Sequence, residues 1–209
     1  MKFVVVSDTH GTHAGLTMPQ GEVLIHCGDA LDLGTEEELI RLNNWFKKMR
    51  KYSFHEIIYV PGNHDIIIEE DPGFSREILD QATILIDETF IYKGIKIHGS
   101  PYVPTFGNWA FMKPDLNLQR HWDNIPDDTD VLITHGPPYG ILDKNHIGQC
   151  CGSQTLYMAV SKKQPLFHCF GHIHEGAGTY CIDPTTYINA AIITSYWDTT
   201  NKIPKEFII

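Results

Sequence analysis

Five short apolar runs in this chain are each followed at once by polar residues. The runs are Phe3–Val6, Val23–Ile25, Ile57–Val60, Val131–Ile133 and Leu166–Phe170. Runs of this length, rich in β-branched and aromatic side chains, predict buried strands. Polar groups directly after such strands lie at the carboxyl edge of an open α/β sheet, where these folds place their sites. The pattern therefore predicts an α/β protein with its functional site at the strand ends.

The segments that follow the five runs carry carboxylates, imidazoles and one amide. They are Asp8-Thr9-His10, Gly28-Asp29, Gly62-Asn63-His64-Asp65, His135-Gly136 and Gly171-His172-Ile173-His174. Most of these segments taken alone are typical of turns, which Gly, Asn and Asp favour. Together they form a mixed oxygen and nitrogen ligand set, which suits Mn²⁺, Fe or Zn²⁺ better than metals that prefer thiolates. We therefore predict a site for two divalent metal ions.

This ligand set favours phosphoryl chemistry. Asp29 is the natural bridge, because a carboxylate can bind two ions at once. Two ions roughly 3.5–4 Å apart can share a hydroxide and stabilise both oxygens of an in-line phosphoryl displacement. His64 is adjacent to Asn63, so we expect it just outside the metal ligands, where it stabilises or protonates the leaving oxygen as a general acid. We expect Asp65 to hold the His64 imidazole in the required tautomer.

Length and composition limit the possible partners. The 209 residues are enough for a substantial core, so we expect residues 1–209 to form a single domain. The formal net charge of −10 argues against long nucleic acids as partners. We find neither a signal-peptide core nor an apolar stretch of roughly 18 residues that could span a membrane. The five cysteines form no regular framework, which predicts a reduced, cytoplasmic protein.

Other segments predict the remaining elements. Residues 35–51 have a Thr35/Glu38 capping box and an apolar face, which indicates a helix. Further helices are expected at Ser153–Val160 and Phe74–Gln81, and a hairpin at Phe90–Tyr92 and Ile95–His98, around Lys93-Gly94. Late strands are expected near Gly178–Cys181, Thr186–Asn189 and Phe207–Ile209. Early alternation of strands and helices, followed mainly by strands, indicates a layered fold with more than one sheet.

Residues 98–126 differ from the rest of the chain because prolines and aromatic residues alternate there. We interpret this segment as an ordered loop near the site, where function tends to concentrate. The alternative is that its aromatic side chains fill a small additional core. Under the first interpretation, a nucleotide base stacks on Trp109, Tyr102 or Phe106.

The five ligand segments, in this order, resemble the calcineurin-like metallophosphoesterase superfamily from Asp8 to about Asn189. The resemblance implies a four-layer α/β/β/α sandwich with two mixed β-sheets. It implies one metal bound by Asp8, His10, Asp29 and His174, and a second bound by Asp29, Asn63, His135 and His172. His64 would be the catalytic histidine.

The intervening segments are similar to the MPPED-type branch, which resembles class III cyclic nucleotide phosphodiesterases. They are His26–Asp29, Gly99–Pro104, Phe106–Phe111, Thr134–Pro138 and Gly171–Gly176. The resemblance implies hydrolysis of a small phosphodiester or nucleotide, cyclic nucleotides included, with Mn²⁺ or Fe as the metals and Zn²⁺ as an alternative. A phosphomonoesterase or protein phosphatase, a nuclease, and a metal-binding scaffold without catalysis remain alternatives.

Overall fold

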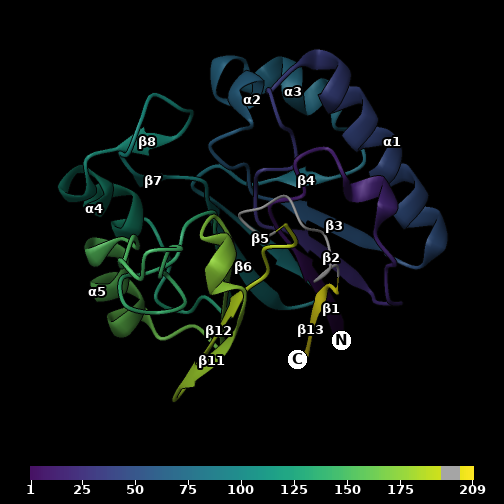
Figure 1. Ribbon diagram of the computed structural model, residues 1–209. Coiled ribbons are helices and arrows are strands. Elements are labelled where there is room, and N and C mark those ends of the chain that lie inside the picture. Colours follow the sequence, from purple (N-terminus) through teal and green to yellow (C-terminus); the bar gives the residue numbers. More distant parts are fainter. Residues whose placement is uncertain (194–202) are drawn as a thin grey trace.

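Two large mixed sheets form the centre of the computed structural model, which describes residues 1–193 and 203–209 (Figure 1). The first sheet has the strand order β13-β1-β2-β3-β4, and only β13 is antiparallel to its neighbour. Its strands are β1 (Lys2–Val6), β2 (Val23–His26), β3 (Glu56–Tyr59), β4 (Thr83–Ile84) and β13 (Lys205–Ile208). The ends of β1, β2 and β3 therefore meet at one edge, as the sequence predicts.

The second sheet has the order β11-β12-β10-β9-β6-β5. Its strands are β5 (Glu88–Tyr92), β6 (Ile95–Ser100), β9 (Val131–Thr134), β10 (Phe167–Phe170), β11 (Gly178–Ile182) and β12 (Thr185–Asn189). The four inner strands are parallel, and β5 and β11 pair antiparallel at the edges. The predicted hairpin is confirmed as β5 and β6, and the three late strands are confirmed as β11, β12 and β13.

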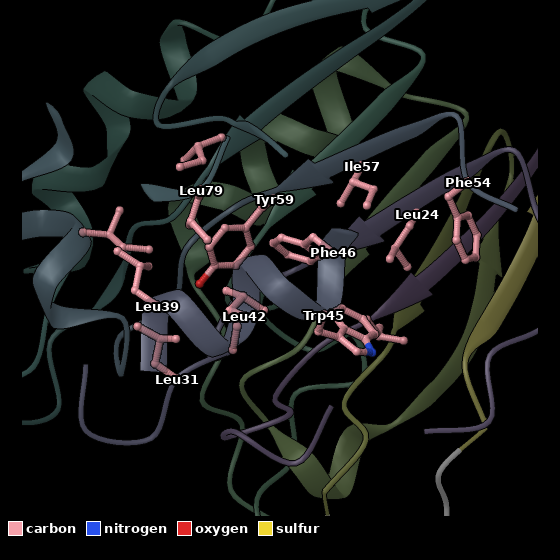
Figure 2. Packing of buried hydrophobic residues seen from close by; sticks show 14 of the residues in the cluster. Leu24, Leu31, Leu39, Leu42, Trp45, Phe46, Phe54, Ile57, Tyr59 and Leu79 are labelled. Carbon is pink, nitrogen blue, oxygen red and sulfur yellow. The ribbon is translucent and has the colours of Figure 1, made fainter. Parts of the chain in front are cut away.

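Side chains of successive residues along the strands point into different layers, as the pleat of a strand requires. In β1, Val4 and Val6 belong to a core cluster shared with α1, whereas Phe3 and Val5 belong to a cluster between the two sheets. Figure 2 shows the first of these clusters, with Trp45 and Phe46 of α1 facing the sheet. Burying each such side chain contributes about 1.5–3 kcal/mol.

The helices cover the outer faces of the two sheets. In Figure 1, α1 (Glu36–Tyr52), α2 (Ile66–Glu70) and α3 (Pro72–Ile78) lie together on one side, and α4 (Asp115–Asp123) and α5 (Gln154–Lys163) on the other. A third core cluster joins α4 and α5 to the second sheet. The order helix, sheet, sheet, helix confirms the predicted α/β/β/α sandwich with two mixed sheets.

The predicted helix boundaries are close to those observed. The capping box at the start of α1 is present: the Glu38 backbone N–H donates to Thr35 Oγ1, and the Glu38 carboxylate accepts from the Thr35 backbone N–H. At α5 the Ser153 Oγ accepts from the Leu156 backbone N–H, which gives a side-chain cap without the reciprocal bond. Within the described part of the chain, we find no helix with the length and hydropathy needed to cross a membrane.

The interpretation of residues 98–126 as a loop is wrong for much of that segment. It contains the short parallel pair β7 (Val103–Pro104) and β8 (Met112–Lys113), followed by α4. Pro114 occupies the N-cap position of α4, so the prolines mark the start of a helix. Both interpretations of its aromatic residues hold in part: Trp122 is fully buried against α5, whereas Phe106 and Trp109 are exposed near the metal centre.

Candidate metal centre

The side chains predicted as metal ligands gather at the shared carboxyl edge of the two sheets. One triad is Asp8, His10 and His174, and another is Asp29, His135 and His172. Within each triad the potential ligand atoms lie within 4.8 Å of one another. The two triads follow β1, β2, β9 and β10, so strands of both sheets contribute to one centre.

Asp29 connects the two triads. Its Oδ2 lies 3.9 Å from His10 Nε2 and 3.3 Å from His135 Nε2. Asn63 Oδ1 is 3.0 Å from the same His135 nitrogen, which places the amide oxygen beside the second triad. A carboxylate oxygen between two imidazoles, with a neutral oxygen on one side, is the arrangement expected of a bridging ligand.

Several of these residues have a positive φ angle, a backbone conformation that residues other than glycine rarely adopt. The φ angles are 53° at Asp8, 39° at His10, 50° at Asp29 and 68° at His172. A residue in such a conformation costs about 1–3 kcal/mol, and these residues cluster at functional sites. The left-handed conformation turns the chain sharply at the strand end. We therefore attribute the strain to the convergence of ligands on a common centre.

Two glycines allow the loops to approach each other this closely. A Cβ on Gly62 would lie 2.3 Å from Asp29 Oδ1, and a Cβ on Gly171 would lie 2.0 Å from Asp8 Oδ2. Both distances are far below normal contact, so any side chain at either position would displace a carboxylate. The glycines in Gly62-Asn63 and Gly171-His172 are thus required by packing around the ligands.

The centre buries two carboxylates against imidazoles. Burial opposes the charge of each carboxylate, but His174 beside Asp8 and His135 beside Asp29 lower the pKa of both well below the ordinary range. Burial likewise opposes protonation of His135, but the Asp29 carboxylate outweighs it and raises the pKa of His135 to about 9. Among the described residues, neither carboxylate has a lysine or arginine partner. Divalent cations fit this donor set, because they would supply positive charge to ionised carboxylates that are excluded from water.

Contacts outside the triads orient the ligands. His135 Nδ1 lies 2.9 Å from the Cys27 carbonyl oxygen, which accepts a hydrogen bond when Nδ1 carries the proton and leaves Nε2 to face the centre. The His172 backbone N–H donates to both Asp8 oxygens, at 3.0 and 2.9 Å. Asn189 donates from Nδ2 to the Ile173 carbonyl and so fixes the loop that carries two histidines. Such outer contacts are a regular part of metal sites.

His64 lies beside the first triad. Its ring is 4.6 Å from the His10 ring, edge to face, and Trp109 stacks on it at 4.4 Å. The His64 backbone N–H donates to Asp29 Oδ1 at 2.8 Å, so the ring position is tied to the bridging carboxylate. His64 Nδ1 lies 2.7 Å from the Asp32 carbonyl oxygen. If Nδ1–H donates there, Nε2 is left to meet a substrate.

The expectation that Asp65 orients the His64 ring is wrong. The Asp65 carboxylate instead accepts from the backbone N–H groups of Asp29, Leu31 and Gly62, at 2.9, 2.9 and 2.6 Å. It therefore ties the loop after β2 to the loop after β3. Burial, together with repulsion from Asp29, raises the pKa of Asp65 to about 6. The orienting oxygen for His64 comes from Asp32.

Sequence reasoning missed two contributors to the centre. Asp32 provides the carbonyl for His64, and its carboxylate Oδ1 is 3.8 Å from His10 Nδ1. Its spacing, three residues after Asp29, is the signal that would have indicated it. His26 has Nε2 3.0 Å from Thr9 Oγ1 and so supports the turn between Asp8 and His10. Its position directly after the apolar run Val23–Ile25 is the signal that places it near the site.

The chain is similar to several known proteins. A family model described as calcineurin-like phosphoesterase matches residues 1–176. Metallophosphoesterase domain-containing protein 1 of Homo sapiens is 34% identical, over 96% of this chain and 68% of its own. UPF0046 protein K07C11.7 of Caenorhabditis elegans is 36% identical, over 91% of this chain and 69% of its own. A solved structure described as a novel archaeal phosphodiesterase is 17% identical, covers 100% of both chains and has a TM-score of 0.50. The chain belongs to the calcineurin-like phosphoesterase family.

Proposed function

We propose that this protein is a binuclear metal-dependent phosphodiesterase. The observation that carries the proposal is the position of Asp29 Oδ2 between His10 and His135, with His64 beside the first triad. Two divalent ions, most simply Mn²⁺ or Fe, would generate a nucleophile from water at neutral pH and neutralise charge on the phosphoryl oxygens. Asp8, His10, Asp29 and His174 would hold one ion, and Asp29, Asn63, His135 and His172 the other.

His64 would serve as the general acid. Its ring is held by the Asp32 carbonyl on Nδ1 and by Trp109 on one face, so Nε2 has a defined direction. Protonating an alkoxide leaving group removes the charge that develops on it as the bond to phosphorus breaks. This group favours esters that need such help, among them nucleotides with ribose oxygens as leaving groups.

A diester fits the charges of the site better than a monoester. The Asp32 side chain is 42% exposed and its carboxylate lies 3.8 Å from His10, so a negative charge lies beside the first triad. A phosphomonoester carries up to two negative charges near neutral pH, whereas a diester carries one. Repulsion at this position would therefore disfavour the monoester.

Steady-state hydrolysis by protein stripped of metal and reloaded with Mn²⁺ tests the proposal. We would compare bis(4-nitrophenyl) phosphate, 4-nitrophenyl phosphate and the 2′,3′- and 3′,5′-cyclic nucleotides. We expect diester hydrolysis that is lost in Asp29→Asn. His64→Ala should slow cyclic nucleotides by about 10²–10⁴-fold, the range for general acid catalysis. It should slow the nitrophenyl diester much less, because nitrophenolate leaves without a proton. Monoester preference would instead identify a phosphatase, and full turnover of cyclic nucleotides by His64→Ala would remove the assigned role of His64.

A further inference from the structure

A cleft of about 550 Å³ opens beside the second triad. Its lining includes His172 and Ile173 at the metal centre, Pro104 to Phe106 on one side, and a loop from Asn145 to Cys151 on the other. This volume is within the roughly 300–1,000 Å³ of small-molecule sites. His172 lines the cleft and also belongs to the second triad, so a substrate bound at the two metals would extend directly into the cleft.

Hydrogen bonds within the protein hold both walls of the cleft in place. The Val103 N–H donates to the Phe111 carbonyl, and the Thr105 N–H donates to the Lys113 carbonyl, so an arm projects with Phe106 near its tip. Opposite, Asn145 Oδ1 accepts from the backbone N–H groups of residues 147 and 149 and closes the second loop. The cleft is thus formed before any ligand binds.

The chemistry of the lining is aromatic and polar but uncharged. Phe106 is 60% exposed, with its ring 5.2 Å from the His172 ring. His146 and Gln149 are exposed, and their side chains have no hydrogen-bond partner among the residues that the structure describes. None of the lining residues is Lys, Arg, Asp or Glu. An uncharged planar ring with hydrogen-bonding edges matches these walls, whereas a second phosphate would find no cation there.

The cleft and His64 lie at different triads. His64 contacts His10 of the first triad and Trp109, while the cleft contains His172 of the second triad. The leaving oxygen must be the one that meets His64, so a group held in the cleft is attached to the other ester oxygen. That group remains bonded to phosphorus after cleavage.

We infer that this cleft binds the retained substituent of the substrate, that Phe106 selects an uncharged nucleoside there, and that substrates carry one phosphodiester and no further phosphate. The inference rests on the proposed phosphodiesterase function. In the reaction, the oxygen of water forms a bond to phosphorus and the bond to the leaving oxygen breaks. His64 gives its proton to that oxygen and is reprotonated by the proton released from water. The products are an alcohol and a nucleoside monophosphate, and for a cyclic nucleotide the freed hydroxyl belongs to that same nucleoside monophosphate.

Two substrates with the same leaving group test the cleft separately from the chemistry. Methyl 4-nitrophenyl phosphate and thymidine 5′-(4-nitrophenyl phosphate) differ only in the retained substituent. For the Mn²⁺-loaded protein we expect a KM at least about fivefold lower for the thymidine ester, which is the lower end of what one stacked base contributes. Phe106→Ala should remove this preference with little change in kcat, and Phe106→Tyr should keep it. Leu116→Ala, at a surface position that is 84% exposed, is the matched control and should change neither KM.

Three results would overturn the inference. One is an equal KM for the two esters in the wild-type protein. Another is an equal loss on both esters in Phe106→Ala, which would mean that the ring acts through His172. The third is tighter binding when the thymidine ester carries an added 3′-phosphate.

If neither ester is hydrolysed, the proposed function fails, but calorimetric binding of thymidine 5′-monophosphate against methyl phosphate still tests the cleft. Tighter nucleotide binding that Phe106→Ala abolishes would support it, and equal binding would refute it.

Discussion

His168 gives a prediction about acid stability whose size follows from the structure. The ring is fully buried in β10, and Nε2 lies 2.9 Å from Thr134 Oγ1. Because the Thr134 hydroxyl donates to the Gly136 carbonyl, its oxygen accepts from His168 Nε2–H. Nδ1 has no hydrogen-bond partner among the described residues, so protonation would create a buried cationic N–H without an acceptor. Burial accordingly lowers the pKa of His168 to about 3.

The sign of the effect follows from the two states. The unfolded chain takes up the proton as the pH falls below 6.5, while the folded chain stays neutral down to about pH 3. Lowering the pH within this window therefore favours the unfolded state. At pH 5, 1.5 units below the ordinary value, a cost of about 1.36 kcal/mol per unit gives about 2 kcal/mol from His168 alone. This is a substantial part of a typical stability of about 5–15 kcal/mol.

Urea unfolding of the wild-type protein and His168→Gln at pH 7.5 and pH 5 measures this contribution. The glutamine amide can still donate to Thr134 but does not titrate. We expect the loss of unfolding free energy between the two pH values to be about 2 kcal/mol smaller in the variant, whatever its stability at pH 7.5. His55→Gln, at an exposed position, controls for the loss of a histidine. Equal losses in wild type and His168→Gln would refute the argument from burial.

Three further changes probe the metal centre. Gly171→Ala should displace Asp8, since the added Cβ would lie 2.0 Å from Oδ2, and metal analysis should show at most one tightly bound ion per chain. Asp29→Asn should also reduce the bound metal below two ions and lower diester turnover by at least about 100-fold, because changes in outer contacts alone cost 10–100-fold. Trp109→Ala should slow diesters with alkyl leaving groups by about 2- to 12-fold, as a stacked pair of ~0.5–1.5 kcal/mol allows, and should leave nitrophenyl esters nearly unchanged.

Controls separate these effects from general destabilisation. Gly94→Ala introduces a methyl group at a hairpin turn with a φ of 88° and nothing within 4 Å, so it adds backbone strain without crowding a ligand. If Gly171→Ala retains two ions, or if Gly94→Ala also loses them, the assignment of Gly171 to the packing around Asp8 is incorrect. A Trp109→Ala variant that slows nitrophenyl and alkyl esters equally would contradict a role through His64.

Much of the fold could be predicted because buried parallel strands appear in the sequence as continuous apolar runs. Phe3–Val6 and Val131–Ile133 are such runs, and in the structure both lie beside parallel neighbours, β1 with β2 and β9 with β10. The convergence of Asp8, Asp29 and the histidines at one edge was predictable for the same reason. By contrast, the sequence did not predict the helix α4, because the prolines near its two ends suggest a loop when they are considered without tertiary context.

The errors at the centre have a common cause. Asp65 was assigned to His64 because the two are neighbours in sequence, but its carboxylate turns away and accepts backbone N–H groups from the loop after β2. The orienting group for His64 is the main-chain carbonyl of Asp32, 32 residues earlier in the chain. A backbone carbonyl has no residue type, so no sequence motif can indicate it directly. Only the loop conformation brings it to His64.

Under the proposed function, the chemistry and the substrate selectivity belong to elements that differ in burial. The candidate ligands Asp8 and Asp29, both strained, follow strands that are buried on both faces, under α1 and between the two sheets, and this packing can sustain a few kcal/mol of backbone strain. Phe106 instead lies near the tip of an exposed arm, held by a few backbone hydrogen bonds. A substitution at Phe106 costs little folding free energy, because its side chain is 60% exposed and little buried area is lost. Under the proposed function, a change of substrate would therefore come from changes at Phe106 and in the loop at residues 145–151, whereas a change at the strand ends would remove the candidate metal ligands and the reaction together.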